Sequence, residues 1–325
     1  MVLSLRNTAL AAALSLAAAA VGHAETFKFA HPVPESDPQH QMALFFAEEL
    51  DKRTDGALTV QIFPNGQLGN DQQMIDGVRS GIIDFSLVGL NNLTGLMPQT
   101  GAIELPFMFP TREVAYKVLD GEVGTGLGEQ FGQHGMISLG FPENGYRNMT
   151  NNRGPIREPG DVAGLQMRVN NSKALNDMFA LLGATPQQLP VAELYTALET
   201  GVVDSQDHPI AITLSFKYYE VQEYLSMTQH AYSALSFFMN KSKFDGLSPE
   251  HQEIVLQTAK DAVAMQRELS IAKESEMIAE LESHGMEVND DVDSAAFQEA
   301  SKSVWTSFTD ENGEEIVNAI LEASK

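Results

Sequence analysis

Two arginines are the residues of this chain best suited to holding a small anion. Arg168 lies in the stretch 165–169, where apolar and polar residues alternate, so a strand there would place Arg168 on the polar face. A guanidinium held on a strand matches a carboxylate with two parallel hydrogen bonds. Arg147 precedes a segment rich in turn-forming residues. The alternative for each arginine is a solvated surface position or a partnership with one of the many acidic residues.

A histidine and several asparagines could supply further contacts. His208 ends a predicted strand beside Pro209, and a polar residue at a strand end often faces the cleft of an α/β fold. A surface histidine is the alternative. Amides both donate and accept hydrogen bonds, which suits a ligand with hydroxyls as well as a carboxylate, although at least half of these asparagines are expected to serve turns. The asparagines are Asn91, Asn92, Asn144, Asn148, Asn151, Asn152, Asn170 and Asn171.

The composition excludes several other kinds of chemistry. The 325 residues include no cysteine, which removes disulfides, thiolate nucleophiles and zinc–thiolate sites together. Acidic residues outnumber basic ones 44 to 20, and the net charge of -24 argues against nucleic acid or an anionic membrane surface as a partner. The same charge repels an anionic ligand, so an anion site must be built from local, well-placed cations.

The sequence lacks the motifs of common hydrolases and nucleotide-binding enzymes. There is no G-x-S-x-G elbow, no H-E-x-x-H pair and no glycine-rich phosphate loop. The histidines His31, His40, His208 and His230 are scattered without a metal-ligand spacing. We therefore expect a binding protein with no enzymatic activity, no cofactor and no metal. A secreted hydrolase is the alternative, and ligand binding without turnover would separate the two.

Strands and helices alternate along the chain, which predicts an α/β fold. The predicted strands have apolar residues at every second position, whereas the predicted helices have them at spacings of three and four. No internal repeat is visible, which argues against a structural or adhesive protein. The predicted strands are 26–30, 58–62, 82–88, 136–141, 165–169 and one beginning at 201–204; the predicted helices are one starting at 36–38 and those over 71–80, 176–182 and 192–199.

One long helix is predicted near the C-terminus. Ser248-Pro249 is a cap followed by proline at the first helical position, and no glycine or proline intervenes before Gly285. A continuous helix of this length would be roughly 50 Å long, whereas a domain of about 150 residues is roughly 30 Å wide. The helix must therefore kink or lie across two domains. Two helices with an undetected break are the alternative.

The first 24 residues have the form of a secretory signal. Arg6 is their only charge, an apolar run extends from Ala9 to Ala20, and Gly22-His23-Ala24 resembles a cleavage site. The apolar run is about 12 residues, shorter than the roughly 20 that span a bilayer. We expect cleavage after Ala24 and a mature protein in the periplasm.

Several motifs occur in a fixed order along the chain: Phe29-Ala30-His31, Phe63–Gly69, Leu105–Phe109, Gly145–Asn151, Gly164–Val169 and Glu193–Pro209. Taken together, they resemble those of the periplasmic solute-binding proteins of tripartite ATP-independent periplasmic (TRAP) transporters, of the C4-dicarboxylate-binding type. The resemblance covers nearly the whole chain after residue 24. The order and separation of the motifs make it specific, unlike any single motif.

The resemblance implies a clamshell of two lobes with a long helix bridging both. On this basis lobe I is expected to comprise 25–145 plus about 232–265, and lobe II 146–231 plus about 266–325. The family also implies an organic-acid ligand and, as partners, the membrane subunits of a TRAP transporter that receive it.

The resemblance further implies roles for individual residues. Arg168 matches the family's main carboxylate clamp, and Arg147 matches a second arginine that often contacts the same ligand. The family usually has Asp-Gly-Gln-Glu-Asn-Pro, with the asparagine facing the ligand, where this chain has Asp204–Pro209, so His208 replaces that asparagine. Histidine keeps a hydrogen-bonding group but changes its reach and adds an ionisable ring. The predicted ligand-binding residues are Arg168, Arg147, His208, Asn170, Asn92, Asn148 and His31.

The many amides favour a sugar acid, such as a uronate, as the ligand. The arginines would bind its carboxylate, while Asn170, Asn92 and His208 would bind its hydroxyls. A C4-dicarboxylate such as succinate or malate is the second candidate, with the two arginines each binding one carboxylate. A zwitterionic osmolyte such as ectoine is disfavoured, because aromatic cages bind such ligands and the only tryptophan lies in a polar segment near the C-terminus.

Overall fold

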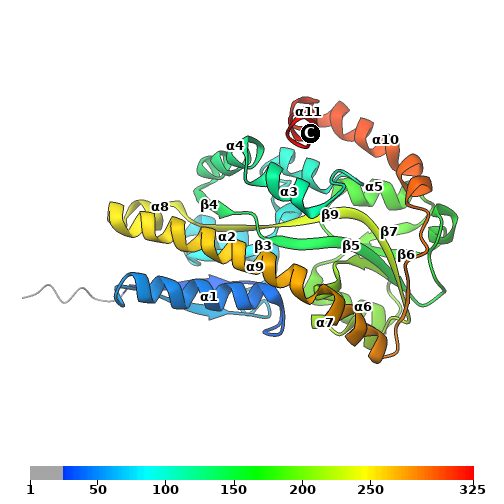
Figure 1. Cartoon of the computed structure of the whole chain (residues 1–325), viewed down its shortest axis with the longest axis horizontal. Helices are drawn as coiled ribbons and strands as arrows, with labels where there is room; N and C mark the ends of the chain where they lie inside the picture. Colours follow the sequence, from blue (N-terminus) through cyan, green and yellow to red (C-terminus); the bar gives the residue numbers. More distant parts are fainter. Residues whose placement is uncertain (1–24) are drawn as a thin grey trace, which may run out of the picture.

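The computed structural model describes residues 25–325, and the predicted signal peptide lies outside the described residues. The predicted α/β class is confirmed, because helices pack around a mixed sheet of ten strands (Figure 1). The main strand order is β2-β1-β3-β9-β5-β8-β6-β7, and β4 and β10 pair with β9 off this path. The strands are β1 (Glu25–Ala30), β2 (Leu58–Phe63), β3 (Phe85–Gly89), β4 (Met136–Gly140), β5 (Glu143–Asn151), β6 (Gln166–Val169), β7 (Thr185–Gln188), β8 (Ser205–His208), β9 (Tyr224–Asn240) and β10 (Glu287–Asn289).

Several helices begin where the sequence supplies their caps. The side chain of Ser248 accepts a hydrogen bond from the backbone N–H of His251 at the start of α9. At α2, Asn70 and Gln73 form a complete capping box, and the helix has the bounds predicted for it. The helices are α1 (Pro38–Arg53), α2 (Asp71–Ser80), α3 (Arg112–Leu119), α4 (Glu122–Gln130), α5 (Lys173–Leu181), α6 (Val191–Glu199), α7 (Ile210–Ser215), α8 (Lys241–Asp245), α9 (Pro249–Ser283), α10 (Ser294–Asn312) and α11 (Glu315–Ala323).

Strand β9, which connects the two halves of the sheet, is absent from the sequence-based prediction. Its C-terminal part pairs with β3 and β4, and its N-terminal part pairs with β5 and β10. Every residue of β9 from His230 to Asn240 is buried. Because both faces of this stretch are covered, it lacks the alternation of polar and apolar residues by which a strand is recognised.

Arg147, which precedes residues that favour turns in the sequence, lies within the strand β5. This strand pairs antiparallel with β8 on one side and β9 on the other. Its register with β9 shifts between Glu143 and Gly145 and again between Arg147 and Met149. Such irregularities bend a strand and redirect the side chains beside them. The glycine and asparagines of this segment therefore belong to an irregular strand rather than to a loop.

The segment after Ser248 is a single helix, α9, of 35 residues, so the alternative of two helices is wrong. Its first half packs on α1 and β4, and Val255 and Ala259 join the core that contains β1 and β3. Near its C-terminal end, Met277 and Leu281 join a separate cluster around α7 and β10. The helix therefore contacts two cores, and it lies across the long dimension of the molecule (Figure 1).

The C-terminal helices divide between the two halves of the molecule. Helix α10 packs on α5, whereas α11 packs on α3 and α4. The predicted boundaries place both C-terminal helices in lobe II but α3 and α4 in lobe I, so α11 makes contacts across the predicted boundary. The boundaries themselves stay a prediction. Among residues 25–325, no helix is both long enough and apolar enough to cross a membrane.

Candidate ligand-binding site

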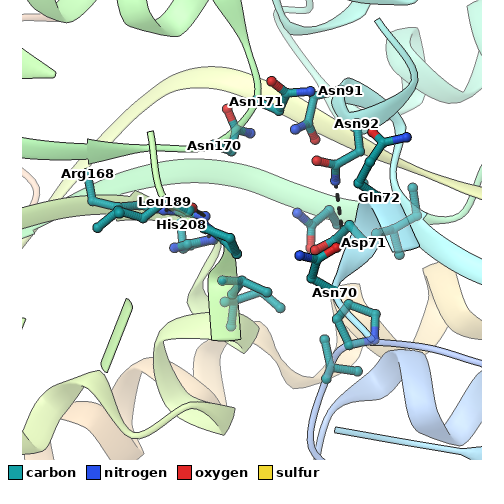
Figure 2. Close-up of a pocket in the computed structure, with 18 of the residues that line it drawn as sticks. Asn70, Asp71, Gln72, Asn91, Asn92, Arg168, Asn170, Asn171, Leu189 and His208 are labelled. Atoms are coloured by element: carbon teal, nitrogen blue, oxygen red, sulfur yellow. Dashed lines mark hydrogen bonds between the residues drawn. The ribbon is translucent and has the colours of Figure 1, made fainter. Parts of the chain in front are cut away.

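A cavity of about 390 Å³ lies between the two halves of the sheet. One wall comes from the N-terminus of α2 and the residues that follow β3, and the other from the ends of β6 and β8 and from 188–191 (Figure 2). The residues that follow β3 and the ends of β6 and β8 lie at the carboxyl ends of strands, where α/β folds place their ligands. Five of the seven predicted ligand-binding residues line the cavity: Arg168, Arg147, His208, Asn170 and Asn92.

Arg168, on β6, is a buried cation with no carboxylate partner. Its Nε and Nη2 donate to the carbonyl oxygen of Leu189 at 3.0 and 2.7 Å, and its Nη1 lies 3.1 Å from Nε2 of His208. Within residues 25–325 it has no ion pair shorter than 4.0 Å. Burial lowers the pKa of Arg168. Because an unpaired buried charge is costly, a carboxylate entering the cavity would supply the missing counter-ion.

Hydrogen bonds to both ring nitrogens determine the tautomer of His208. Its Nδ1 lies 2.5 Å from Oε1 of Gln206, and Nε2 of the same glutamine donates to Thr150 at 2.8 Å. Because an amide oxygen only accepts, Nδ1 carries the proton and Nε2 accepts from Arg168. Burial and the neighbouring Arg168 hold the pKa of His208 well below its usual range, so the ring is neutral. His208 thus orients Arg168, and neither nitrogen is free for the predicted contact with a ligand hydroxyl.

The neutral ring of His208 should make the stability of the folded protein depend on pH. Because the pKa of His208 is lower in the folded than in the unfolded protein, where it is near 6.5, the unfolded state takes up a proton first as the pH falls. His208 should therefore cost the wild type about 1.4 kcal/mol of unfolding free energy per pH unit below 6.5, relative to His208→Asn. Urea unfolding of both unliganded proteins at pH 7.5 and 5.5 measures this difference. Parallel pH dependences in the two proteins would contradict the assignment.

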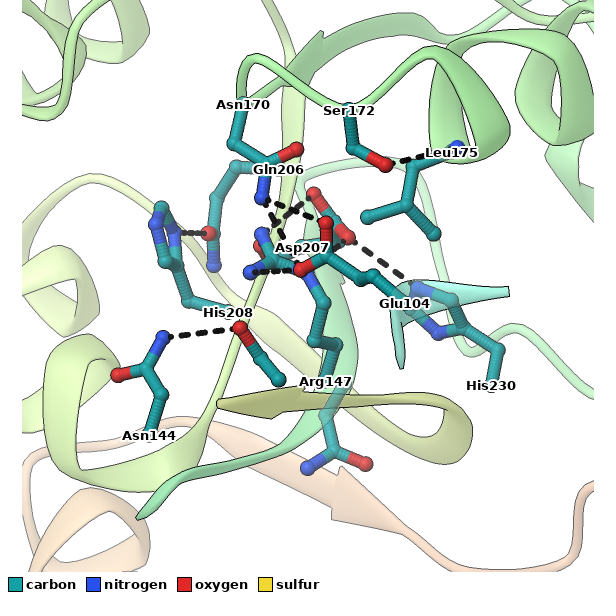
Figure 3. Close-up of polar contacts among 12 residues, drawn as sticks. Glu104, Asn144, Arg147, Asn170, Ser172, Leu175, Gln206, Asp207, His208 and His230 are labelled. Carbon is teal, nitrogen blue, oxygen red and sulfur yellow. Dashed lines mark hydrogen bonds and ion pairs between the residues drawn. The ribbon is translucent and has the colours of Figure 1, made fainter. Parts of the chain in front are cut away.

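Arg147, in contrast, is held by acidic side chains (Figure 3). It is 1 % exposed, and its Nε and Nη2 donate to the two carboxylate oxygens of Asp207 at 2.6 and 3.1 Å. Its Nη1 lies 3.4 Å from Glu104. Although burial alone would raise the pKa of Asp207, Arg147 and His230 bring it well below its usual range. The charge of Arg147 is therefore already balanced inside the protein, which is the alternative that the sequence left open.

Glu104 joins this network to the cavity wall. It ends the 3₁₀ helix Pro98–Glu104, and its two oxygens accept from Nδ2 of Asn170 at 3.2 and 3.3 Å. Burial raises the pKa of Glu104, and the nearby Arg147 opposes this shift. The contact holds the amide of Asn170 by its nitrogen and leaves its oxygen available.

Three buried amide atoms on the cavity wall lack a hydrogen-bond partner within the described part of the chain. They are Nδ2 of Asn91, Oδ1 of Asn170 and Oε1 of Gln39. Buried polar atoms are nearly always hydrogen-bonded, so such atoms mark places where water or a ligand binds. One donor and two acceptors match hydroxyl groups, which both accept and donate. Asn92 differs, because its Nδ2 already lies 3.3 Å from Oδ1 of Asp71.

Asn148 and His31, predicted to bind the ligand, are not among the residues that line the cavity. The amide of Asn148 donates to the carbonyl of Tyr146 at 3.2 Å and accepts from the backbone of Gln229 at 3.1 Å. His31 is fully buried, with Nε2 3.0 Å from Nδ1 of His40. Burial and His40 lower the pKa of His31 to about 3. The amide of Asn148 and Nε2 of His31 are therefore used within the fold, whereas Nδ1 of His31 has no hydrogen-bond partner among residues 25–325. A ligand-binding role for these two residues stays a prediction that the lining of the cavity does not support.

Several polar residues of the site were not predicted from the sequence. Asp71 and Gln39 line the cavity, while Glu104 and Asp207 hold the residues that do. For Asp71 a signal was present, because it opens a predicted helix and helix N-termini face the cleft in many α/β folds. Asp207 directly precedes His208, but nothing local indicates that it pairs with Arg147.

The chain matches the family described as bacterial extracellular solute-binding protein, family 7 (DctP), over residues 29–312. It is 42% identical over 277 residues to the 2,3-diketo-L-gulonate-binding periplasmic protein YiaO of Escherichia coli K12, which covers 85% of this chain and 84% of that protein.

Two solved structures of TRAP periplasmic solute-binding proteins are also similar. One, from Sulfitobacter sp. NAS-14.1 with bound β-D-galacturonate, is 32% identical with a TM-score of 0.88, and the match covers 91% of this chain and 99% of that one. The other, from Sulfurospirillum deleyianum with bound succinate, is 30% identical with a TM-score of 0.88, and the match covers 93% of this chain and 100% of that one. These matches confirm the two-lobed fold. The chain therefore belongs to family 7 of the bacterial extracellular solute-binding proteins, the TRAP family that its motifs resemble.

Proposed function

We propose that this protein is the periplasmic solute-binding subunit of a TRAP transporter, that it captures a sugar acid, and that it delivers this ligand to the membrane subunits. One observation carries the proposal: Arg168 is a buried cation on the cavity wall without a carboxylate partner among residues 25–325. A ligand carboxylate would neutralise it through charge-assisted bonds. Family membership supports the binding role and the transport partners.

The wall around Arg168 supports a ligand with hydroxyl groups. The unpartnered amide atoms of Asn91, Asn170 and Gln39 offer both donors and acceptors. Binding an analogue without hydroxyls would leave those buried atoms unsatisfied, which costs affinity. Among the relatives, the Escherichia coli protein is named for a keto sugar acid and the Sulfitobacter protein holds a uronate. A uronate such as glucuronate or galacturonate stays our specific prediction.

A C4-dicarboxylate is the second candidate, and the succinate-bound relative supports it. It would require Arg147 and Arg168 each to bind one carboxylate. Asp207 already occupies Arg147 through two hydrogen bonds, which weakens this candidate. A zwitterion such as ectoine is disfavoured, because such ligands bind in aromatic cages and the residues that line the cavity include no phenylalanine, tyrosine or tryptophan. Trp305 instead donates to the carbonyl of Pro106.

A thermal-shift screen of the unliganded protein tests the proposal. Uronates and related sugar acids should raise the melting temperature strongly, succinate and malate weakly, and neutral sugars hardly at all. Assays of the same compounds for turnover should detect none, as expected of a binder rather than a hydrolase. The largest shift with succinate or malate and none with sugar acids would replace our proposal with the dicarboxylate function. The largest shift with ectoine would reject both anionic candidates.

A further inference from the structure

The cavity has opposite charges on its two walls. The arginine and aspartate side chains that line the cavity are Arg147, Arg168 and Asp71. Because Arg147 is paired with Asp207, the charges left facing a ligand are the cation of Arg168 and the carboxylate of Asp71. They lie on opposite walls, as Figure 2 shows. An acid in an anion-binding cavity is unexpected, and it calls for an explanation in terms of the ligand.

The carboxylate of Asp71 has capacity to bind a ligand. Its Oδ1 accepts from Nδ2 of Asn92 at 3.3 Å, and within residues 25–325 it has no ion pair shorter than 4.0 Å. Burial raises the pKa of Asp71, and its own backbone N–H and the nearby Arg168 only partly oppose this shift. The position of Asp71 in the first turn of α2 also opposes the upward shift and favours the ionised carboxylate, because the helix dipole is positive there.

Asp71 is not needed to cap its helix. The capping box of α2 is complete without it, because Asn70 accepts from the backbone of Gln73 and Gln73 accepts from the backbone of Asn70. A carboxylate that faces the cavity and has no essential part in the helix start is available to select ligands.

We propose that Asp71 restricts the site to acids with a single carboxylate, held at Arg168, and with a hydroxyl at the opposite end. The hydroxyl would donate a charge-assisted hydrogen bond to Asp71, which is stronger than a bond between neutral groups. A second carboxylate at that end would instead meet a like charge in a partly desolvated cavity and would be repelled. This inference rests on the proposed sugar-acid function and extends it to ligand selection.

Matched pairs of acids test the proposal by calorimetry. Galactonate and galactarate, or gluconate and glucarate, share their internal hydroxyls and differ in whether the far end is a primary alcohol or a carboxylate. The wild type should bind the monocarboxylate of the preferred pair at least tenfold more tightly. Asp71→Asn, which keeps the shape and removes the charge, should reduce that preference at least tenfold. Asp76→Asn is the matched control, because it removes one negative charge from an exposed position of the same helix, where Asp76 pairs with Arg79 at 3.1 Å.

The outcomes separate this proposal from the function on which it rests. Equal affinity of the wild type for both members of the pair would overturn the role of Asp71, as would a preference that Asp71→Asn leaves unchanged. So would an equal loss of preference in Asp76→Asn, since the effect would then come from net charge alone. Binding of succinate without binding of any sugar acid would instead reject the proposed function itself.

Discussion

Replacing Arg168 with alanine should lower the affinity for the sugar acid a hundredfold or more. The change would remove the proposed two-point, charge-assisted contact with the ligand carboxylate, and each such bond contributes about 1.5–3 kcal/mol. The unliganded protein should still fold, because the variant removes a buried cation that has no counter-ion among residues 25–325. Isothermal titration calorimetry measures the affinity, and circular dichroism of the unliganded variant measures its folding.

Two further variants make the test specific to the guanidinium. Arg168→Lys should not restore binding, because an ammonium group cannot reproduce the planar guanidinium, which can donate to the carbonyl of Leu189 and to the ligand carboxylate at the same time. Arg157→Ala removes a half-exposed arginine that pairs with Asp291 at 2.7 Å, and it should leave affinity unchanged. Near-normal binding by Arg168→Ala would show that the carboxylate is held elsewhere, with Arg147 as the first residue to examine.

Asp207→Asn should have its largest effect on stability, lowering the unfolding free energy of the unliganded protein by about 3–5 kcal/mol. Asp207 is fully buried and neutralises Arg147 through two hydrogen bonds. Removing its charge leaves a buried guanidinium whose one remaining carboxylate partner among residues 25–325 is Glu104, at 3.4 Å. Urea denaturation followed by circular dichroism measures the change.

A surface ion pair provides the control for this prediction. Asp291 pairs with Arg157 at 2.7 Å but is well exposed, so Asp291→Asn should change stability little. If Asp207→Asn lowered the unfolding free energy as little as Asp291→Asn, Arg147 would not need Asp207 as its counter-ion. Arg147 could then bind a second carboxylate, and the dicarboxylate function would gain support. The contrast with Arg168→Ala, which should reduce binding and spare folding, separates the two arginines.

Local signals allowed much of the fold to be predicted from the sequence. Helix α2 has the predicted bounds because its capping box and its end at Gly81 act within one turn of the chain. Helix α9 begins at the predicted cap, Ser248. Strand β9 was missed because its buried stretch has no polar face, so its strand character depends on the elements that cover it.

For the site, the sequence determined which residue types meet, and the tertiary structure decided how their charges are used. Motif order and alternation were enough to place Arg168, Arg147 and His208 at the cavity. They could not show that Arg147 is neutralised by Asp207, 60 residues away, or that His208 accepts from Arg168. The partner of a buried charge is set by which strands lie side by side, here β5 and β8 in antiparallel register. That pairing joins residues that are far apart in the sequence, so no local sequence pattern indicates which arginine is left without a carboxylate partner.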